Sequence, residues 1–331
     1  MTEPLDGWIL HALQLTPRVS FRRIGDVIGV PEQTVARRYH RMRRDGVVRV
    51  VGLVNPRVFG DAEWLVRVRA KPDDLTRLAD ALVRRPEVTH ANVHSGWTEL
   101  VCVIRAPLNQ GSDGLLQRLP RTTSVLDLDI DLMLHRFGEP AAVPWTAYGH
   151  KLTGEQAAEI LGSAETASAG EPLVPTDDDQ SLFEVLGEDG RAPNSRLAEL
   201  TGWSAARVGR RLAALHAAGT LTYDVDILPD QLGFEVNAML WLTTVPRHVH
   251  AVGSEIAAHD EIASAAAITG RNNVMAIAIC RDVDDLYRYL AERLATVDHI
   301  QSYDVSIRTS RLKETTSLIS QGRLIPGGRI H

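Results

Sequence analysis

Residues 34–50 of the chain read TVARRYHRMRRDGVVRV. Five arginines fall within eight positions, and an Asp-Gly pair then separates them from a run of β-branched residues. Val35, Tyr39 and Met42 recur at helical spacing and predict a helix that buries these three side chains. A strand is expected over Val47–Val54. The stretch raises the question of whether the arginines lie on a solvated surface or contact a polyanion.

Two further short helices are predicted before this one. Leu5, Ile9 and Leu13 recur at helical spacing in the first, and Ser20 is placed to cap the second. Gly29 makes the sharp connection to the arginine-rich helix. Three short helices with a tight turn, followed by a strand, predict a winged helix-turn-helix module.

The same pattern occurs twice in the chain. A shift of 173 residues aligns the two copies without a gap over some 55 positions, and one added residue extends the alignment to Gly96 and Gly270. Because chance does not keep a fixed offset through so many positions, we infer a tandem duplication. The aligned pairs include Asp6 with Asp179, Arg18 with Arg191, Gly29 with Gly202, Arg37 with Arg210, Arg38 with Arg211, Gly46 with Gly219, Pro56 with Pro229 and Gly60 with Gly233.

The second part of each copy alternates strand and helix patterns in the order βαββαβ. This order predicts a ferredoxin-like domain, so the fold class is α+β. One antiparallel sheet with helices on one face leaves the other face to find a partner. The expected elements are 64–70, 73–84, 88–95, 98–105, 110–119 and 125–134 in the first copy, and 237–244, 248–258, 262–269, 273–280, 283–295 and 300–311 in the second.

Domain boundaries follow from this repeat. Residues 138–177 are rich in Pro, Gly, Ala and Ser and are interpreted as a linker with one short helix near Thr153–Leu161. The expected ranges are a winged helix-turn-helix at 1–60, a ferredoxin-like domain at 61–137, the linker at 138–177, a second winged helix-turn-helix at 178–234, a second ferredoxin-like domain at 235–314 and a tail at 315–331.

The charge is distributed unevenly. The chain has a net charge of −6, yet residues 1–60 hold ten arginines against five carboxylates, a net +5. Residues 177–235 hold five arginines against eleven carboxylates, a net −6. Like-charge neighbours on a helix are destabilising unless another group supplies the opposite charge. We therefore predict that the first module binds double-stranded DNA and that the second binds more weakly or serves mainly as scaffold.

Helix-turn-helix geometry places the second helix of the motif in the major groove. Gln33, Thr34 and Arg37 are expected to face bases, with Arg38, Arg41 and Arg44 nearer to phosphates. Part of this set must serve structure instead, by pairing with Asp45 or Asp26. The corresponding candidates in the second copy are Ser204, Arg207, Arg210 and Arg211.

Other function classes leave no pattern in the chain. No nucleotide-binding loop, zinc-binding spacing or Ser-His-Asp arrangement is visible, so no cofactor and no enzymatic activity are predicted. Cys102 and Cys280 lie in apolar runs and are expected to be buried, reduced thiols. No apolar run approaches the ~20 residues of a membrane span, and a cytoplasmic protein is expected.

Each copy resembles a complete member of the Lrp/AsnC (leucine-responsive/asparagine-regulator) family of transcription factors. The matching text begins LDGWILHALQLTPRVSFRRIGDVIGVPEQTVARRYHRMRRDG in the first copy and DDQSLFEVLGEDGRAPNSRLAELTGWSAARVGRRLAALHAAG in the second. The resemblance implies a sequence-specific transcriptional regulator with ligand-sensing ferredoxin-like domains of the RAM type. It also implies assembly: the fused copies form a pseudo-dimer within one chain, and at least two chains associate.

In this family small molecules, usually amino acids, bind near the turn between the second and third strands. The family favours an aspartate at the end of this turn, where this chain has Glu99 and Asn273, so the second copy offers no carboxylate to an ammonium group. A simpler interpretation is that Gly96 and Gly270 only permit tight turns. The matching positions are Ser95, Gly96, Trp97, Thr98 and Glu99 in the first copy and Thr269, Gly270, Arg271, Asn272 and Asn273 in the second.

The same module resembles siroheme decarboxylases, which makes an enzyme the alternative function. His90 and His94 are four residues apart on one predicted strand and therefore point to the same face. The resemblance implies that such enzymes place histidine and arginine around a tetrapyrrole. In the second copy, however, the corresponding text is SAAAIT, without histidine.

Overall fold

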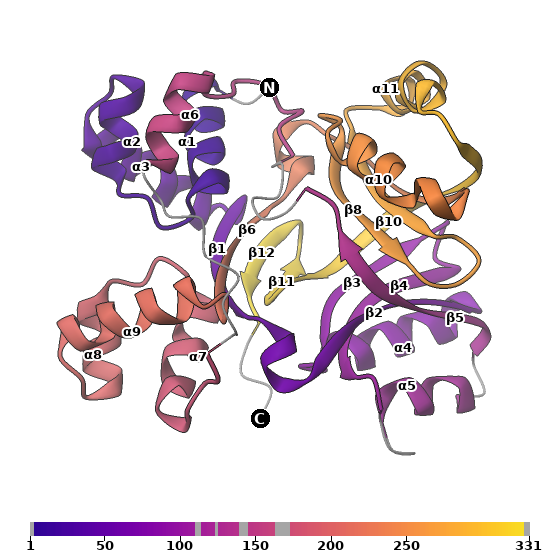
Figure 1. Ribbon diagram of the computed structural model, residues 1–331, viewed down its shortest axis with the longest axis horizontal. Coiled ribbons are helices and arrows are strands. Elements are labelled where there is room, and N and C mark those ends of the chain that lie inside the picture. Colours follow the sequence, from indigo (N-terminus) through magenta and orange to yellow (C-terminus); the bar gives the residue numbers. More distant parts are fainter. Residues whose placement is uncertain (1–2, 110–113, 123–124, 139–144, 163–172, 328–331) are drawn as a thin grey trace.

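The computed structural model describes residues 3–109, 114–122, 125–138, 145–162 and 173–327. The helix-turn-helix modules gather on one side of the molecule and the large sheet with its own helices on the other, as Figure 1 shows. The α+β class and the duplicated pair of domain types are as predicted from the sequence. Part of the predicted helix at 110–119 lies outside the described residues, and a short helix is found at its end, Leu115–Arg118.

The first module folds as its capping and turn residues indicate. The Ser20 hydroxyl accepts a hydrogen bond from the Arg23 amide at 3.1 Å and so caps the second helix. Gly29 ends that helix in the left-handed conformation, with a φ of 72°. Val35, Tyr39 and Met42 are buried, as their spacing predicts. The elements are α1 (Pro4–Leu15), α2 (Phe21–Ile28), α3 (Glu32–Arg44), β1 (Val48–Val54) and a 3-10 turn, η1 (Pro56–Phe59).

The second module repeats this plan. Gly202 and Gly219 take left-handed conformations at the positions of Gly29 and Gly46. Ser204 caps the helix that corresponds to α3, accepting a hydrogen bond from the Arg207 amide at 3.2 Å. The elements are η3 (Asp177–Asp179), α7 (Gln180–Glu188), α8 (Asn194–Thr201), α9 (Ala205–Ala217), β6 (Leu221–Ile227) and η4 (Pro229–Leu232).

The two modules are joined through their wings. Strands β1 and β6 pair antiparallel, and Val51 lies opposite Asp224, its own equivalent in the repeat. The pairing is therefore centred on the two-fold axis that relates the copies. Gly52 lies so close to α7 that an added Cβ would approach the Leu186 Cβ to 2.8 Å. The wing of the first module thus packs on a helix of the second.

Two equivalent arginines clamp the modules reciprocally. Arg18 donates hydrogen bonds to the carbonyl oxygens of Gly190 (2.5 Å) and Ala192 (3.1 Å). Arg191 donates to those of Pro17 (2.6 Å) and Val19 (2.7 Å). Each arginine holds the loop that carries the other, and Arg191 also lies over the Phe21 ring at 4.5 Å.

The two ferredoxin-like domains have the predicted order βαββαβ. The last helix of the second domain continues from α11 into a π-helical turn, η6, and a 3-10 turn, η7. The elements are β2 (Asp61–Ala70), α4 (Pro72–Val83), β3 (Val88–His94), β4 (Glu99–Pro107), α5 (Leu115–Arg118), η2 (Leu119–Arg121) and β5 (Val125–Arg136), then β7 (Val236–Thr244), η5 (Pro246–His248), α10 (Val249–Ala257), β8 (Ile262–Ile268), β9 (Val274–Cys280), α11 (Val283–Arg288), η6 (Tyr289–Arg293), η7 (Leu294–Thr296) and β10 (Ile300–Glu314).

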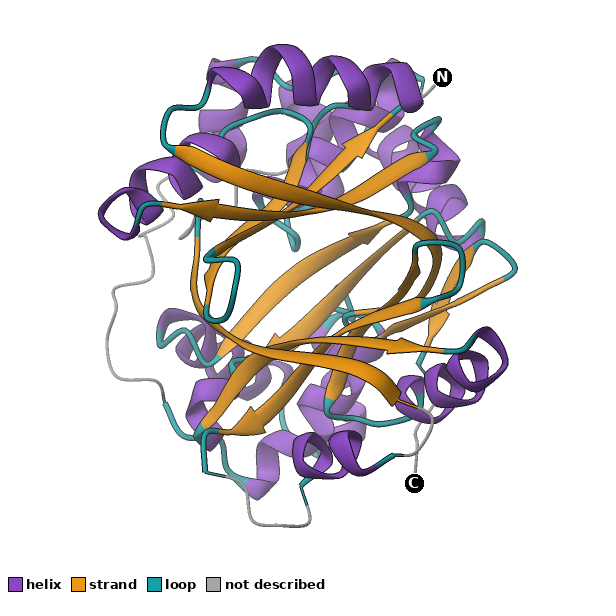
Figure 2. Ribbon diagram, turned by 90° about the vertical axis from the view of Figure 1, so that its right-hand side faces the viewer, coloured by secondary structure: helices purple, strands orange, loops and turns teal. Residues whose placement is uncertain are grey.

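The two sheets close into one barrel. The strand order is β10-β3-β4-β2-β5-β8-β9-β7, and β7 pairs again with β10. Closure leaves these strands no free edge. Figure 2 shows the two sheets facing each other with helices on their outer sides. The sheet face that the sequence left without a partner is thus covered by the other copy of the same chain.

The last strand of each copy crosses into the other copy. Strand β5 pairs with β2 of its own copy and then with β8. Strand β10 pairs with β7 and then with β3. Phe137 follows β5 into the core of the second domain, and Leu312 packs against the core of the first. Between the sheets an apolar core includes Leu65, Trp241 and Met275.

The predicted linker is partly an integral piece of the first module. Its helix, α6 (Gly154–Leu161), begins with a capping box formed by Thr153 and Gln156, close to the expected position. Ile160, Trp145 and Tyr148 are buried in the same core as α1–α3. Residues 145–162 therefore complete the helix-turn-helix core in addition to connecting the copies.

In the segment predicted as a tail, the described residues 315–327 instead contain a β-hairpin. Strands β11 (Ser317–Ser320) and β12 (Arg323–Pro326) extend from β10 and reach the first module. The Leu324 amide donates to the Gly46 carbonyl at 2.9 Å, and Arg49 donates to the Ile325 carbonyl at 2.9 Å. The tail prediction was wrong because a four-residue strand carries too little periodicity to be recognised in the sequence.

Replacing Arg191 by alanine should lower the free energy of unfolding by about 1–3 kcal/mol, because two partly buried carbonyl groups lose their donor. Arg196→Ala, on an exposed face of the same module, should change it by less than about 0.5 kcal/mol. Urea denaturation of both variants measures the difference. If the two variants prove equally stable, the hydrogen bonds of Arg191 do not contribute to the stability of the fold.

Candidate nucleic-acid interface

The outer face of α3 carries a row of cations. Arg37 and Arg44 are exposed, and Arg37 has no ion pair within the described part of the chain. The Arg44 Nε lies 3.6 Å from Asp45 on the surface, one of the two internal partners that the sequence suggested. Gln33 is exposed and Thr34 is half-buried at the start of the helix. These residues are open to an approaching ligand.

Arg38 and Arg41 are instead tied to the first helix. Arg38 forms ion pairs with Glu3 at 2.5 Å and Asp6 at 3.6 Å, and its side chain is only 22% exposed. Arg41 pairs with Asp6 at 2.8 Å while staying 43% exposed. The expected phosphate contact of Arg38 is therefore not favoured, because its guanidinium group neutralises a nearly buried carboxylate. Burial raises the pKa of Asp6, and the two arginines oppose that rise.

The second reading helix, α9, shows the same division. Arg211 binds Asp179 through two hydrogen bonds of 2.8 and 2.5 Å, and Asp179 is fully buried. Its expected role at DNA is therefore not favoured either. Arg207 lies over the Trp203 ring at 3.9 Å and 3.8 Å from Asp178. Arg210 is exposed, and Ser204 is used as the helix cap.

The repeat makes this division systematic. Arg37 and its equivalent Arg210 are exposed, whereas Arg38 and its equivalent Arg211 each bind an aspartate near the start of their module, Asp6 of α1 and Asp179 of η3. A rotation of about 100° between adjacent helix positions accounts for the difference. Of two adjacent arginines, one is available for binding and one is structural.

The predicted sensing turn of the first copy lies against the last strand of the second. The Ser95 amide donates to the Ile307 carbonyl at 2.9 Å, and the Gly96 amide donates to the Thr309 hydroxyl at 3.1 Å. Gly96 and Trp97 both take positive φ, so the tight-turn role of this glycine is present. Glu99 is buried and bound by Arg67, which also lies 4.6 Å from the centre of the Trp241 ring.

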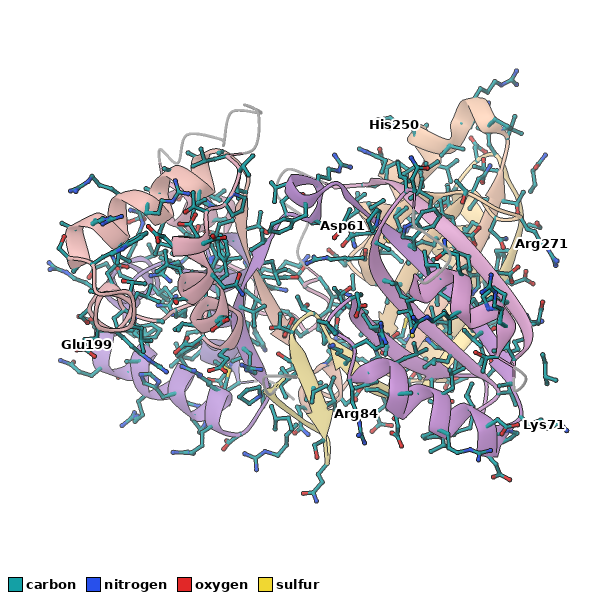
Figure 3. All side chains as sticks on the ribbon, turned by 90° about the horizontal axis from the view of Figure 1, so that it is seen from below. Asp61, Lys71, Arg84, Glu199, His250 and Arg271 are labelled. Atoms are coloured by element: carbon teal, nitrogen blue, oxygen red, sulfur yellow. The ribbon has the colours of Figure 1, made fainter. Side chains whose placement is uncertain are left out.

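The turn of the second copy is arranged reciprocally, with a carboxylate that the sequence did not predict there. Thr269 exchanges hydrogen bonds with the Leu132 backbone of β5 at 2.8 and 3.0 Å. Asp131 of the first copy lies against Gly270, and burial raises its pKa to about 6. Asn273 is used internally by the backbone of Thr244. Arg271 and Asn272 complete this turn, and Arg271 lies at the opposite end of the molecule from Glu199 of α8 (Figure 3).

Comparison with known proteins decides the family. The AsnC-type helix-turn-helix model matches residues 4–43 and 176–216, and the Lrp/AsnC ligand-binding-domain model matches residues 237–318. The chain belongs to the Lrp/AsnC family. The double match of the helix-turn-helix agrees with the tandem duplication of the Lrp/AsnC unit.

Relatives of this Lrp/AsnC protein match one copy at a time. An uncharacterised HTH-type transcriptional regulator of Pyrococcus abyssi is 28% identical over 133 residues, which cover 40% of this chain and 84% of the relative. The regulatory protein AsnC of Escherichia coli K12 is 27% identical over 132 residues, which cover 39% of this chain and 86% of AsnC. The crystal structure of the siroheme decarboxylase NirDL covers 97% of this chain and 96% of its own, with a TM-score of 0.63 and 16% identity. That likeness concerns the fold of the fused Lrp/AsnC unit.

His90 and His94 lie on the inner face of β3, opposite to Ala91 and Val93 of the outer core, as their spacing predicts. The His94 Nδ1 lies 3.2 Å from the Ser306 carbonyl, and burial lowers its pKa to about 4. His90 lies 3.8 Å from Glu314, and burial lowers its pKa as well. Both rings are therefore neutral at pH 7, packed within the Lrp/AsnC barrel.

Two further findings concern the described ranges only. Within them, no three His, Cys, Asp or Glu side chains are grouped so that they could hold a metal ion. In the same part of the chain, no helix combines the length and apolar character needed to traverse a lipid bilayer. Cys102 and Cys280 are buried free thiols, as expected.

Arg38→Ala should destabilise the first module by about 1–3 kcal/mol, because the Asp6 carboxylate loses one of its two guanidinium partners. Arg37→Ala, one position away, should change the free energy of unfolding by less than about 0.5 kcal/mol. Chemical denaturation measures both. The structural assignment fails should Arg37→Ala prove the more destabilising substitution.

The barrel should lose stability in acid through His94. Because its folded pKa of about 4 lies below the ordinary value of 6.5, the unfolded chain binds a proton more readily between these values. Stability should be fully present above pH 6.5 and fall by up to about 3 kcal/mol as the pH drops toward 4. His94→Asn should flatten this slope in urea denaturation relative to the unsubstituted protein. An unaltered slope in His94→Asn would contradict the assignment.

Proposed function

We propose that the protein is a sequence-specific DNA-binding transcriptional regulator that reads DNA chiefly through α3. The observation that carries the proposal is the exposed cationic face of this helix. Arg37 lacks an internal partner within the described residues, and Arg41 and Arg44 remain substantially exposed beside it. A helix-turn-helix presents the start of this helix to base edges, where a bidentate arginine recognises guanine. The regulators named among its relatives support the same function.

Helix α9 contributes less to this proposed binding. Its module carries an excess of carboxylates, and Arg211 forms an ion pair with Asp179. Arg207 keeps its stack on Trp203. Because each neutralised phosphate adds to affinity through counterion release, Arg210 alone supplies little. The second module then serves mainly to hold the first in place through the paired wings.

A small-molecule effector, an amino acid or a related metabolite, is proposed to bind near the two sensing turns. The second turn is the better candidate for an amino acid. Asp131 there provides a carboxylate that is less engaged than Glu99, which Arg67 and Arg69 already pair with. Each turn packs on the last strand of the other copy, so a ligand bound there would alter the contact between the two copies.

We further propose that at least two chains associate. The barrel closes within one chain, so a second chain must use another surface. The candidate surface is the crossing strands, which expose apolar side chains: Leu126 and Leu134 on β5, and Tyr303 and Ile307 on β10. Several readers on one assembly would raise avidity for DNA.

Arg37→Ala should weaken binding to an operator by about tenfold or more, because a base contact of this type contributes about 1–3 kcal/mol. Its repeat equivalent, Arg210→Ala, should weaken binding less, and Arg22→Ala on α2 serves as a surface control. Genomic footprinting supplies the operator, and fluorescence anisotropy at several salt concentrations measures the affinities. Adding candidate amino acids to the same assay tests the effector.

The outcome also ranks the two modules. A larger loss for Arg210→Ala than for Arg37→Ala would overturn the assignment of α3 as the main reader. If the intact protein gives no footprint and no DNA shift, the proposed function as a transcriptional regulator is wrong. A Soret-type absorption band at roughly 400 nm in the purified protein would favour the siroheme decarboxylase alternative.

A further inference from the structure

Equivalent positions of the two copies differ in charge where the barrel meets the helix-turn-helix modules. In the first copy Glu63, on β2, is bound by two arginines. Arg136 of β5 donates to its Oε2 at 2.9 Å, and the Arg105 Nε lies 3.5 Å from its Oε1. The carboxylate thus compensates the two cations, one from its neighbouring strand and one from the crossing strand.

The strand register identifies the corresponding place in the second copy. A shift of 174 residues carries Glu63 to Asn237, and the two stand at equivalent points of the paired strands β2–β4 and β7–β9. The same shift carries Arg105 to Ile279. A neutral amide therefore replaces the carboxylate, and an apolar side chain replaces one of its arginines.

The crossing strand follows a different offset. Arg136 lies opposite Ala266 on β8, and Arg311 lies opposite Asn92, the equivalent of Ala266, on β3. Arg311 therefore occupies the structural position of Arg136. By the same register Arg308 takes the place of Met133. The second copy has two arginines here without a glutamate in the position of Glu63.

The charge of these two arginines is only partly balanced. Arg311 donates to the Ile227 carbonyl at 2.9 Å and lies 3.4 Å from Glu314. With the Asn237 amide turned so that its oxygen faces the neighbouring donors, that oxygen lies 3.0 Å from both terminal nitrogens of Arg308. Arg308 has no carboxylate within ion-pair distance among the described residues. Burial, followed by the nearby Arg311, lowers the pKa of Arg308 to about 9. The group is still cationic at neutral pH.

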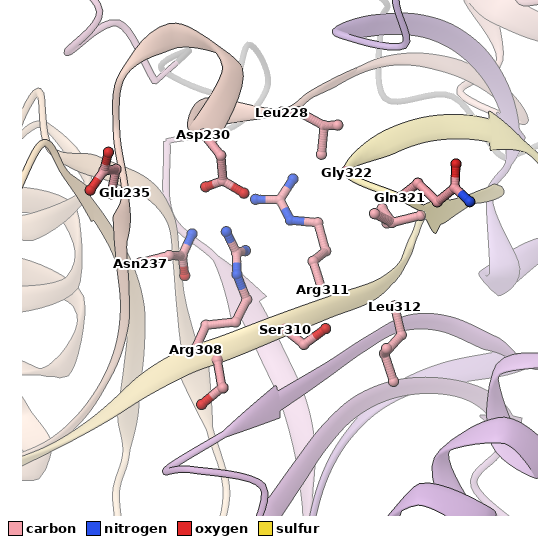
Figure 4. A pocket seen from close by; sticks show the side chains of 12 residues that line it. Leu228, Asp230, Glu235, Asn237, Arg308, Ser310, Arg311, Leu312, Gln321 and Gly322 are labelled. Atoms are coloured by element: carbon pink, nitrogen blue, oxygen red, sulfur yellow. The ribbon is translucent and has the colours of Figure 1, made fainter.

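The two arginines line a cavity of about 380 Å³. Figure 4 shows their side chains rising from β10 toward Asp230 of η4 and Asn237. Leu228 and Gln321 close other sides of it, and the exposed Asp230 and Glu235 stand at its rim. The volume lies near the lower end of the range for small-molecule sites.

We propose that this cavity binds a small oxyanion, a carboxylate or a phosphate, held jointly by Arg308 and Arg311. Guanidinium groups bind such groups through paired, charge-assisted hydrogen bonds, and the oxyanion supplies the charge that Glu63 supplies in the first copy. The acidic rim favours a single small anionic group over a highly charged ligand. The proposed site is separate from both sensing turns.

Its position links the barrel to the reading modules. Arg311 holds the Ile227 carbonyl at the end of the β6 wing, and Gln321 belongs to the β11–β12 hairpin. That hairpin contacts Gly46 directly after α3. A ligand bound to the two arginines would therefore act on segments that contact both wings, β1 and β6. Binding itself does not depend on DNA recognition and is measured without it.

The test titrates the full-length protein with inorganic phosphate and, separately, with propionate, by isothermal titration calorimetry. Saturable binding of at least one probe is expected. Arg308→Gln should weaken it at least tenfold, and Asp230→Asn should tighten phosphate binding severalfold by removing a repulsive charge. Arg288→Gln, on the exposed side of α11, should leave it unchanged. Phosphate binding stronger than propionate binding would identify a phosphate ligand, and the reverse order a carboxylate.

Asn237→Glu is the decisive variant because it restores the glutamate of the first copy. It should abolish binding of either probe while raising the thermal unfolding temperature, since the added carboxylate pairs with Arg308. Asn237→Gln, which alters size without charge, should retain binding within about threefold. Binding of neither probe to the intact protein, or binding that survives both Arg308→Gln and Asn237→Glu, would overturn the proposal.

Discussion

The exchange of last strands between the two copies is the constraint on which the architecture depends. Strands β5 and β10 each begin in one sheet and finish in the other, so that neither sheet is complete without the opposite copy. Phe137 and Leu312 carry this exchange into the two outer cores. The wings repeat the principle at the other end of the molecule, where β1 and β6 pair about the same axis and Arg18 and Arg191 hold each other's loops. Separating the copies would therefore expose apolar surface and unpaired backbone groups in both halves.

The arginine-rich helix is less free than its composition suggests. Three of its five cations bind carboxylates from elsewhere in the fold: Arg38 and Arg41 bind Asp6 of α1, and Arg43 binds Asp189 of the second module at 2.9 Å. These pairs explain how so many like charges are tolerated on one helix without a ligand. Arg37 and Arg44 remain on the outer face, and the proposed DNA recognition rests mainly on them, with the partly exposed Arg41 beside them. Charge density along a sequence therefore overstates the number of groups available for binding.

Much of the fold could be predicted because each element occurs in both copies of the repeat, so that its pattern can be recognised twice. Gly29 and Gly202, for example, mark the same left-handed turn, and the period of Val35, Tyr39 and Met42 marks the same buried stripe as Val208, Leu212 and Leu215. Contacts between segments far apart in the sequence were beyond sequence reasoning. The partner of Arg38 is a carboxylate more than thirty residues away, and Asp131 reaches the sensing turn of the other copy. The strands of the β11–β12 hairpin are too short to show a period. The hairpin is held by hydrogen bonds of its Ser317 with Arg49 and Asp226, which lie far from it in the sequence.

Joining two equivalent units in a single polypeptide changes what evolution can do with them. In an assembly of identical subunits every substitution appears on both sides of the axis, so a site cannot gain a charge on one side and lose it on the other. Here Glu63 and Asn237 occupy matching places yet differ, as do the cationic and acidic reading modules. Symmetry persists in the backbone while the side chains are free to specialise, and one half can keep an ancestral task as the other acquires a new one.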